Sequence, residues 1–132
     1  MKILITNDDG IDAPGLAVLY KIALGLTSAE NILTVAPATE QSGVSHAISY
    51  HGSINLEKIT KNRWACHGTP ADCVIVGISE YDHKFDLVLS GVNRGNNAGQ
   101  NTMYSGTVGA TIEAAMNGIP AIALSQFFGP KL

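Results

Sequence analysis

Residues 1–10 read MKILITNDDG, a nearly continuous apolar run that ends at two adjacent carboxylates, Asp8 and Asp9. A run of Ile and Leu without alternation is typical of a strand covered on both faces, as in a parallel sheet. Gly10 then marks a turn. The sequence therefore predicts a buried strand over residues 2–6 that leads directly into an acidic loop.

The segments that follow alternate between helical spacing and short apolar runs. Helices are expected from Pro14, from Thr69-Pro70 and from Ser105, with Asp12 capping the first. Strands are expected over residues 31–36, 86–92 and 121–125, and the alternation within residues 46–66 indicates an antiparallel hairpin. This order predicts a single α/β domain over residues 1–132, with a mostly parallel sheet and a β-hairpin excursion.

Each of the three expected helices has an apolar stripe that predicts its buried face. The first stripe consists of Leu16, Leu19, Tyr20, Ala23 and Leu26. The last consists of Val108, Ile112, Ala115, Met116 and Ile119. These stripes are expected to pack against the sheet.

Composition excludes several classes of protein. The 132 residues carry 8 Lys and Arg against 11 Asp and Glu, and 45% of them are hydrophobic. That content suits one folded domain, and the weak acidity argues against stable nucleic-acid binding. The apolar run of residues 2–6 is too short for a signal peptide or a membrane span, so a cytoplasmic location is expected.

The cysteines and histidines do not suggest a soft-metal site. Cys66 and Cys73 have neither zinc-finger nor C-x-x-C spacing, which predicts reduced, buried thiols. The four histidines show no clustered ligand spacing either; they are His46, His51, His67 and His83.

Polar residues follow the ends of the expected strands, and parallel strands end at one edge of a sheet. These residues are Asp8, Asp9, Ser42, Asn93 and the helix-opening set Ser105, Gly106 and Thr107. Carboxylate, hydroxyl and amide oxygens suit a hard cation such as Mg²⁺, Mn²⁺ or Ca²⁺, and a helix N-terminus suits a phosphate. Two alternatives stay open: Asp-Asp-Gly is also typical of an ordinary turn, and Ser105 of a helix cap.

Five segments in register carry a resemblance to a known family: residues 1–10, 36–49 (APATEQSGVSHAIS), 67–74 (HGTPADCV), 90–95 (SGVNRG) and 104–110 (YSGTVGA). Together they resemble the SurE survival-protein family of metal-dependent nucleotidases. The resemblance implies a Rossmann-like three-layer sandwich. It also implies a phosphatase that acts on nucleoside 5′- or 3′-monophosphates with one divalent ion, Mg²⁺ or Mn²⁺.

The resemblance also assigns roles to single residues. It implies that the metal ligands are Asp8, Asp9, Ser42 and Asn93, and the two aspartates are also the expected catalytic residues. It implies that the phosphate is bound by Asn97, Ser105, Gly106 and Thr107. Because members of the family are longer than this chain, a metal- or nucleotide-binding domain without useful turnover is the alternative. A homo-oligomer, dimer or tetramer, is expected.

Overall fold

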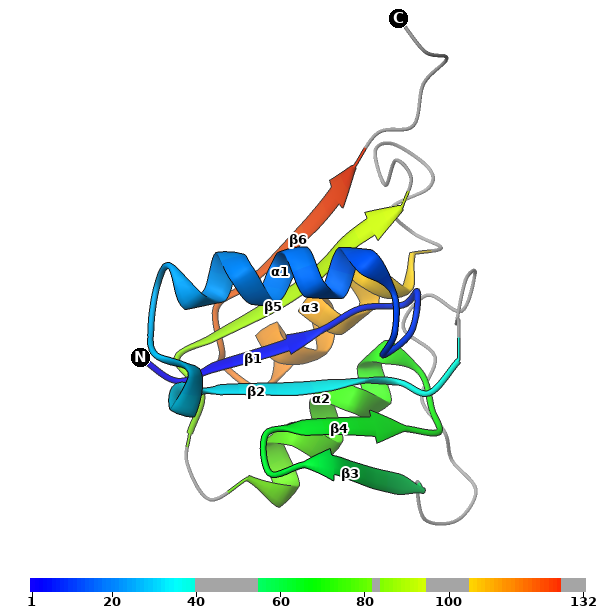
Figure 1. The fold of residues 1–132 in the computed structure, drawn as a ribbon, viewed down its shortest axis with the longest axis horizontal. Helices are drawn as coiled ribbons and strands as arrows, with labels where there is room; N and C mark the ends of the chain where they lie inside the picture. Colours follow the sequence, from blue (N-terminus) through cyan, green and yellow to red (C-terminus); the bar gives the residue numbers. More distant parts are fainter. Residues whose placement is uncertain (40–54, 82–83, 95–104, 127–132) are drawn as a thin grey trace, which may run out of the picture.

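A computed structural model describes residues 1–39, 55–81, 84–94 and 105–126 of the chain. Within them, a six-stranded sheet lies between helices (Figure 1). The elements are β1 (Ile3–Thr6), α1 (Pro14–Leu24), the short 3₁₀ turn η1 (Ala29–Asn31), β2 (Ile32–Pro37), β3 (Leu56–Thr60), β4 (Arg63–Cys66), α2 (Pro70–Glu80), β5 (Leu87–Arg94), α3 (Gly106–Met116) and β6 (Ala121–Gln126). No helix among the described residues is long and apolar enough to cross a membrane.

The strand order across the sheet is β3-β4-β2-β1-β5-β6. Each neighbouring pair is parallel except β3 and β4, which form an antiparallel hairpin. The predicted α/β class and mostly parallel sheet are thereby confirmed. The predicted hairpin is confirmed for its second part, whereas residues 46–54 lie outside the described residues.

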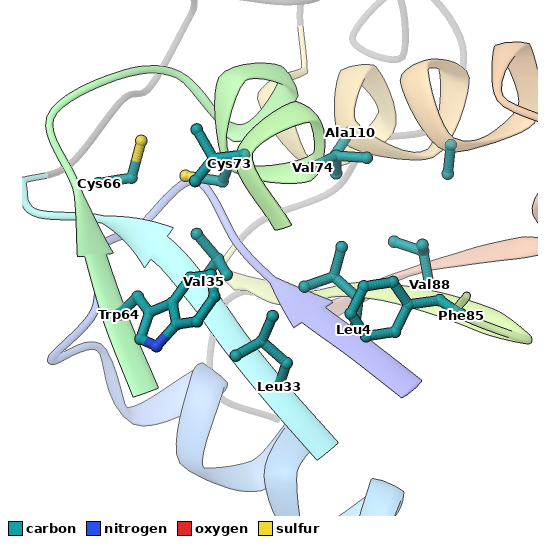
Figure 2. Packing of buried hydrophobic residues seen from close by; sticks show 12 residues of the cluster. Leu4, Leu33, Val35, Trp64, Cys66, Cys73, Val74, Phe85, Val88 and Ala110 are labelled. Carbon is teal, nitrogen blue, oxygen red and sulfur yellow. The ribbon is translucent and has the colours of Figure 1, made fainter. Parts of the chain in front are cut away.

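Helices cover both faces of the sheet, with α1 on one side and α2 and α3 on the other (Figure 1). Ile3 and Ile5 of β1 belong to the hydrophobic cluster under α1. Leu4, between them, belongs to the cluster under α2 and α3, where it lies beside Phe85 and Val88 (Figure 2). Because successive side chains of a strand point to opposite faces, burial on both faces explains the unbroken apolar run of β1.

The start of α1 differs from the prediction that Asp12 caps it. Ala13 occupies the N-cap position without a side-chain hydrogen bond to the helix. Asp12 Oδ1 lies instead 3.4 Å from Arg63 Nη2, which also donates a 2.9 Å hydrogen bond to the carbonyl oxygen of Ile11. The Asp12 side chain thus pairs with a residue 51 positions away in the sequence and does not cap the helix.

The predicted stripe of α3 is wrong for Ile112, Ala115 and Met116, which are exposed, whereas Val108 is half-buried and Ile119, just beyond the helix, packs against the core. The helix buries mainly small residues, among them Gly109, Ala110 and Ala114. Small side chains let the helix lie close to β5, β6 and α2, which turns the larger residues outward. The stripe of α1 is correct for Leu16, Leu19, Tyr20 and Ala23, whereas Leu26 lies beyond the end of the helix and is exposed.

The N-terminal turn of α1 approaches the backbone of β5 very closely. A Cβ atom added to Gly15 would lie 2.1 Å from the carbonyl oxygen of Val92. This distance leaves no room for a side chain, so glycine at residue 15 sets the separation between α1 and β5. Val92 directly precedes Asn93, and the contact therefore also supports the edge of the sheet where the polar residues gather.

The Gly15→Ala variant tests this close approach. We expect the added methyl group to lower the free energy of unfolding by about 2 kcal/mol, because overpacking against a backbone atom displaces the helix. Urea unfolding followed by circular dichroism measures the change. Gly25→Ala is the matched control, since Gly25 has φ −74° in the right-handed helical region and the added Cβ would lie 3.2 Å from the nearest atom, Ile22 O. An equal loss in both variants would contradict the tight contact.

Cys66 and Cys73 are free and buried, as predicted. They belong to the hydrophobic cluster between the sheet and α2 (Figure 2). Burial, reinforced by the neighbouring Cys66, raises the pKa of the Cys73 thiol well above its ordinary value. A thiol with a raised pKa is poorly reactive, so Cys73 is a core residue of the fold.

This raised pKa predicts a loss of stability in alkali. The unfolded chain releases the Cys73 proton near a pKa of about 8.5, whereas the folded chain retains it. Stability due to the neutral thiol is therefore complete below pH 8.5 and falls as the pH rises, by up to about 1.4 kcal/mol per pH unit. Urea unfolding from pH 7 to 10 should give a steeper decline for the wild type than for Cys73→Ala. Parallel declines would contradict the assignment.

Candidate functional site at the carboxyl edge of the sheet

The acidic loop after β1 is a tight turn locked by Asn7. Asn7 Nδ2 donates a 2.7 Å hydrogen bond to the carbonyl oxygen of Gly10, and the Gly10 amide donates a 3.2 Å bond to Asn7 Oδ1. Gly10 has φ +111°, a conformation that L side chains rarely adopt. The turn interpretation of Asp-Asp-Gly is therefore correct for the backbone. The same turn carries Asp8 and Asp9 at its tip.

The end of β5 lies beside this turn. β1 and β5 pair in parallel, with Thr6 opposite Ser90, so both strands lead to the same edge. Asp9 Oδ2 accepts a 3.1 Å hydrogen bond from the backbone amide of Arg94, 85 residues further along the chain. Asn93, next to Arg94, is only 8% exposed. The predicted convergence of Asp9 and Asn93 at one edge is thus present in the fold.

The first turn of α3 reaches the same place. Thr107 Oγ1 donates a 2.9 Å hydrogen bond to Asp8 Oδ1, across 99 residues of sequence. Thr107 is fully buried and Asp8 is 5% exposed. The Asp8 carboxylate therefore lies close to the N-terminus of a helix, where backbone dipoles favour negative charge.

Ser105 caps α3, as the local interpretation of the sequence predicted. Ser105 Oγ accepts a 3.3 Å hydrogen bond from the Val108 amide, and its carbonyl oxygen accepts the Gly109 amide at 2.9 Å. The amides of Gly106 and Thr107 have no acceptor within the helix, because the first amides of a helix never do. Those two amides can bind an anion at this edge.

Contacts in the described part of the chain therefore bring together most of the predicted site residues. Asp8, Asp9, Asn93, Ser105 and Thr107 come from the loop after β1, the end of β5 and the start of α3. Two further candidates, Ser42 and Asn97, lie outside the described residues. Sequence reasoning missed the structural role of Asn7, although an Asn followed three residues later by Gly is a recognised turn pattern.

The donor chemistry of this edge fits a hard cation. The described candidates offer carboxylate, amide and hydroxyl oxygens, which are the ligands that Mg²⁺ and Mn²⁺ prefer. Within the described ranges, no three side chains of His, Cys, Asp or Glu gather into a metal cluster. Any cation at this edge would therefore need amide, hydroxyl or water oxygens beside the two carboxylates.

An acidic turn and a helix N-terminus at the carboxyl edge of a mostly parallel sheet are typical of a Rossmann-like α/β protein, a class in which ligands bind at this edge. Comparison with known proteins then gives the family. The chain belongs to the SurE family: the family model described as "Survival protein SurE" matches residues 3–131.

Individual relatives agree with this assignment. The chain is 60% identical to 5′-nucleotidase SurE of Cereibacter sphaeroides over 99% of its own length and 51% of the relative's, and 56% identical to the protein of that name from Roseobacter denitrificans, with the same coverage. A crystal structure of the SurE protein from Aquifex aeolicus is similar with a TM-score of 0.88 and 38% identity, over 97% of this chain and 52% of that one. The chain thus spans about half the length of these relatives.

The Asn7→Ala variant tests whether the hydrogen bonds between Asn7 and Gly10 stabilise the turn. We expect it to lower the free energy of unfolding by about 2 kcal/mol, because the buried amide and carbonyl groups of Gly10 lose their partner. Asn31→Ala is the control: Asn31 Nδ2 also donates two hydrogen bonds, to Thr27 and Ser28 near the surface, and its loss should be below about 1 kcal/mol. Urea denaturation measures both, and a smaller effect at Asn7 than at Asn31 would contradict the role.

Proposed function

We propose that this chain carries the divalent-metal-dependent phosphomonoesterase site of a nucleotidase that hydrolyses nucleoside 5′- or 3′-monophosphates. The single observation that carries the proposal is the meeting of Asp8, Asp9 and the N-terminus of α3 at one edge of the sheet. The names of the relatives, 5′-nucleotidase SurE, support the nucleotide as substrate class. A phosphate monoester would bind at this edge in two ways. It would contact a metal ion held by the aspartates, and it would accept hydrogen bonds from the amides at the start of α3.

The residues that would hold the metal are Asp8, Asp9, Asn93 and Ser42. Burial of a carboxylate such as Asp8 is costly unless donors or a cation compensate its charge. One Mg²⁺ or Mn²⁺ ion would compensate both aspartates, and when bound it supplies Lewis acidity and a water of lowered pKa. Oxygen ligands favour these ions over zinc.

Other groups of the protein would orient the water and bind the phosphate. The Asp9 carboxylate accepts a hydrogen bond from the Arg94 amide. In the proposed reaction it would orient the attacking water and accept its proton. The amides of Gly106 and Thr107 would bind the phosphoryl oxygens and stabilise the negative charge that develops on them. Asn97 and Ser105 complete the proposed phosphate-binding set. Each of these groups holds or orients an oxygen, as hydrolysis of a phosphate monoester requires.

The second candidate function is binding of metal or nucleotide without useful turnover. The described site residues would then hold the cation and the phosphate without catalysing hydrolysis. Phosphate release from AMP and GMP with Mn²⁺ separates the two functions. Binding of Mn²⁺ and nucleotide without release of phosphate would favour the second.

Self-association and a cytoplasmic location stay predictions. Exposed apolar side chains bear on the first: Ile112 and Met116 lie on α3, and Ile122 lies on β6, the last strand of the described sheet. A strand at the edge of a sheet offers unpaired backbone groups to another chain. Size-exclusion chromatography with light scattering would decide between a monomer and the expected dimer or tetramer.

The Asp9→Asn variant tests the proposed function. Asparagine keeps an oxygen that can accept from the Arg94 amide, but it removes the charge and the base, so we expect phosphate release from AMP to fall about 100-fold or more with an unchanged melting temperature. Asp12→Asn is the control, because that side chain is 90% exposed and pairs only weakly with Arg63. EDTA should abolish wild-type release and Mn²⁺ restore it. Wild-type rates for Asp9→Asn, or full activity in EDTA, would refute the proposal.

A further inference from the structure

We propose that Thr107 is the positioning residue of Asp8: its buried hydroxyl donates to Asp8 Oδ1 and fixes how that carboxylate faces the cation. This role rests on the proposed function, and it differs from the phosphate-binding role that the resemblance implies for Thr107. The evidence is the 2.9 Å bond itself, between a fully buried hydroxyl and a carboxylate that is 5% exposed.

The direction of this hydrogen bond limits what else the hydroxyl can do. An ionised carboxylate only accepts, so Thr107 must donate. A hydroxyl has one proton, and once it is donated to Asp8 it is not available to a phosphoryl oxygen. The Thr107 side chain therefore serves Asp8, and its backbone amide is the part left for the phosphate.

A hydrogen bond to a charged acceptor in a buried setting is shorter, stronger and more directional than one between neutral groups. It restricts rotation of the Asp8 carboxylate about its Cβ–Cγ bond. Outer partners of this kind hold metal-ligating carboxylates in place, and their loss typically lowers metal affinity 10- to 100-fold, roughly. The bond between Thr107 and Asp8 matches that description.

The location of Thr107 in the second position of α3 makes the hydroxyl rigid. Its backbone is fixed by the helix, and a β-branched side chain has few rotamers there. Three tasks are then divided along the first turn. Ser105 caps the helix and the Thr107 hydroxyl holds Asp8. The amides of Gly106 and Thr107 are left to bind the phosphate.

The test compares Thr107→Val, which keeps the shape and removes the hydroxyl, with Thr107→Ser, which keeps the hydroxyl. Thr111→Val is the matched control, because Thr111 lies one turn further along α3 and its hydroxyl donates to Val108 O. Mn²⁺ affinity is measured by electron paramagnetic resonance without nucleotide, so that the readout does not depend on turnover. We expect the Mn²⁺ dissociation constant to rise about 10-fold or more for Thr107→Val, and less than about 3-fold for Thr107→Ser and Thr111→Val.

Steady-state kinetics on AMP at saturating Mn²⁺ give the second readout. If Thr107 positions Asp8, the KM for AMP stays within about 3-fold of wild type in Thr107→Val, since no phosphate contact is lost. Wild-type Mn²⁺ affinity together with a raised KM would overturn the proposal in favour of a phosphate ligand. Equal loss of Mn²⁺ affinity in Thr107→Ser and Thr107→Val would also overturn it, because the hydroxyl would then be irrelevant.

The failure of the proposed function is distinguishable from these outcomes. If wild-type protein binds no Mn²⁺, the metal site itself is refuted and the positioning role falls with it. If wild-type protein binds Mn²⁺ tightly but releases no phosphate, the hydrolase is refuted while the comparison of Mn²⁺ affinities still decides the role of Thr107.

Discussion

The candidate site depends on one constraint, the parallel pairing of β1 with β5. With Thr6 opposite Ser90, the two strands end side by side and send their following residues over the same edge of the sheet. The hydrogen bond from the Arg94 amide to Asp9 is a direct result of this register. A shift by one residue would turn the side chains of β5 to the opposite face and separate these groups.

The second constraint is the buried charge of Asp8. A carboxylate that is almost fully removed from water must be compensated by donors or by a cation. The fold supplies a hydroxyl from Thr107 and the positive end of α3, and it supplies them from a segment 99 residues away. The geometry of α3 on the sheet is therefore part of the site. Small residues such as Ala110 and Ala114 bring that helix close.

Membership of the SurE family and the geometry at the carboxyl edge of the sheet agree with each other, but they bear on different properties of the chain. Family membership gives the Rossmann-like fold and the nucleotidase name of the relatives. Contacts in this chain give the partners of Asp8 and Asp9. The chain spans about half the length of those relatives, and the partners of both aspartates lie within it.

Much of the fold followed from the sequence alone, because the features that set it are local. The unbroken apolar run of β1 and the Thr69-Pro70 start of α2 reflect burial and capping within a few residues. The carboxylates at the end of β1 were visible for the same reason. What only the tertiary structure decided was which distant group each residue meets: Arg63 for Asp12, the Arg94 amide for Asp9, and Thr107 for Asp8. The outward turn of Ile112 and Met116 likewise depends on how closely α3 packs, a distance set by several elements at once and by no single stretch of sequence.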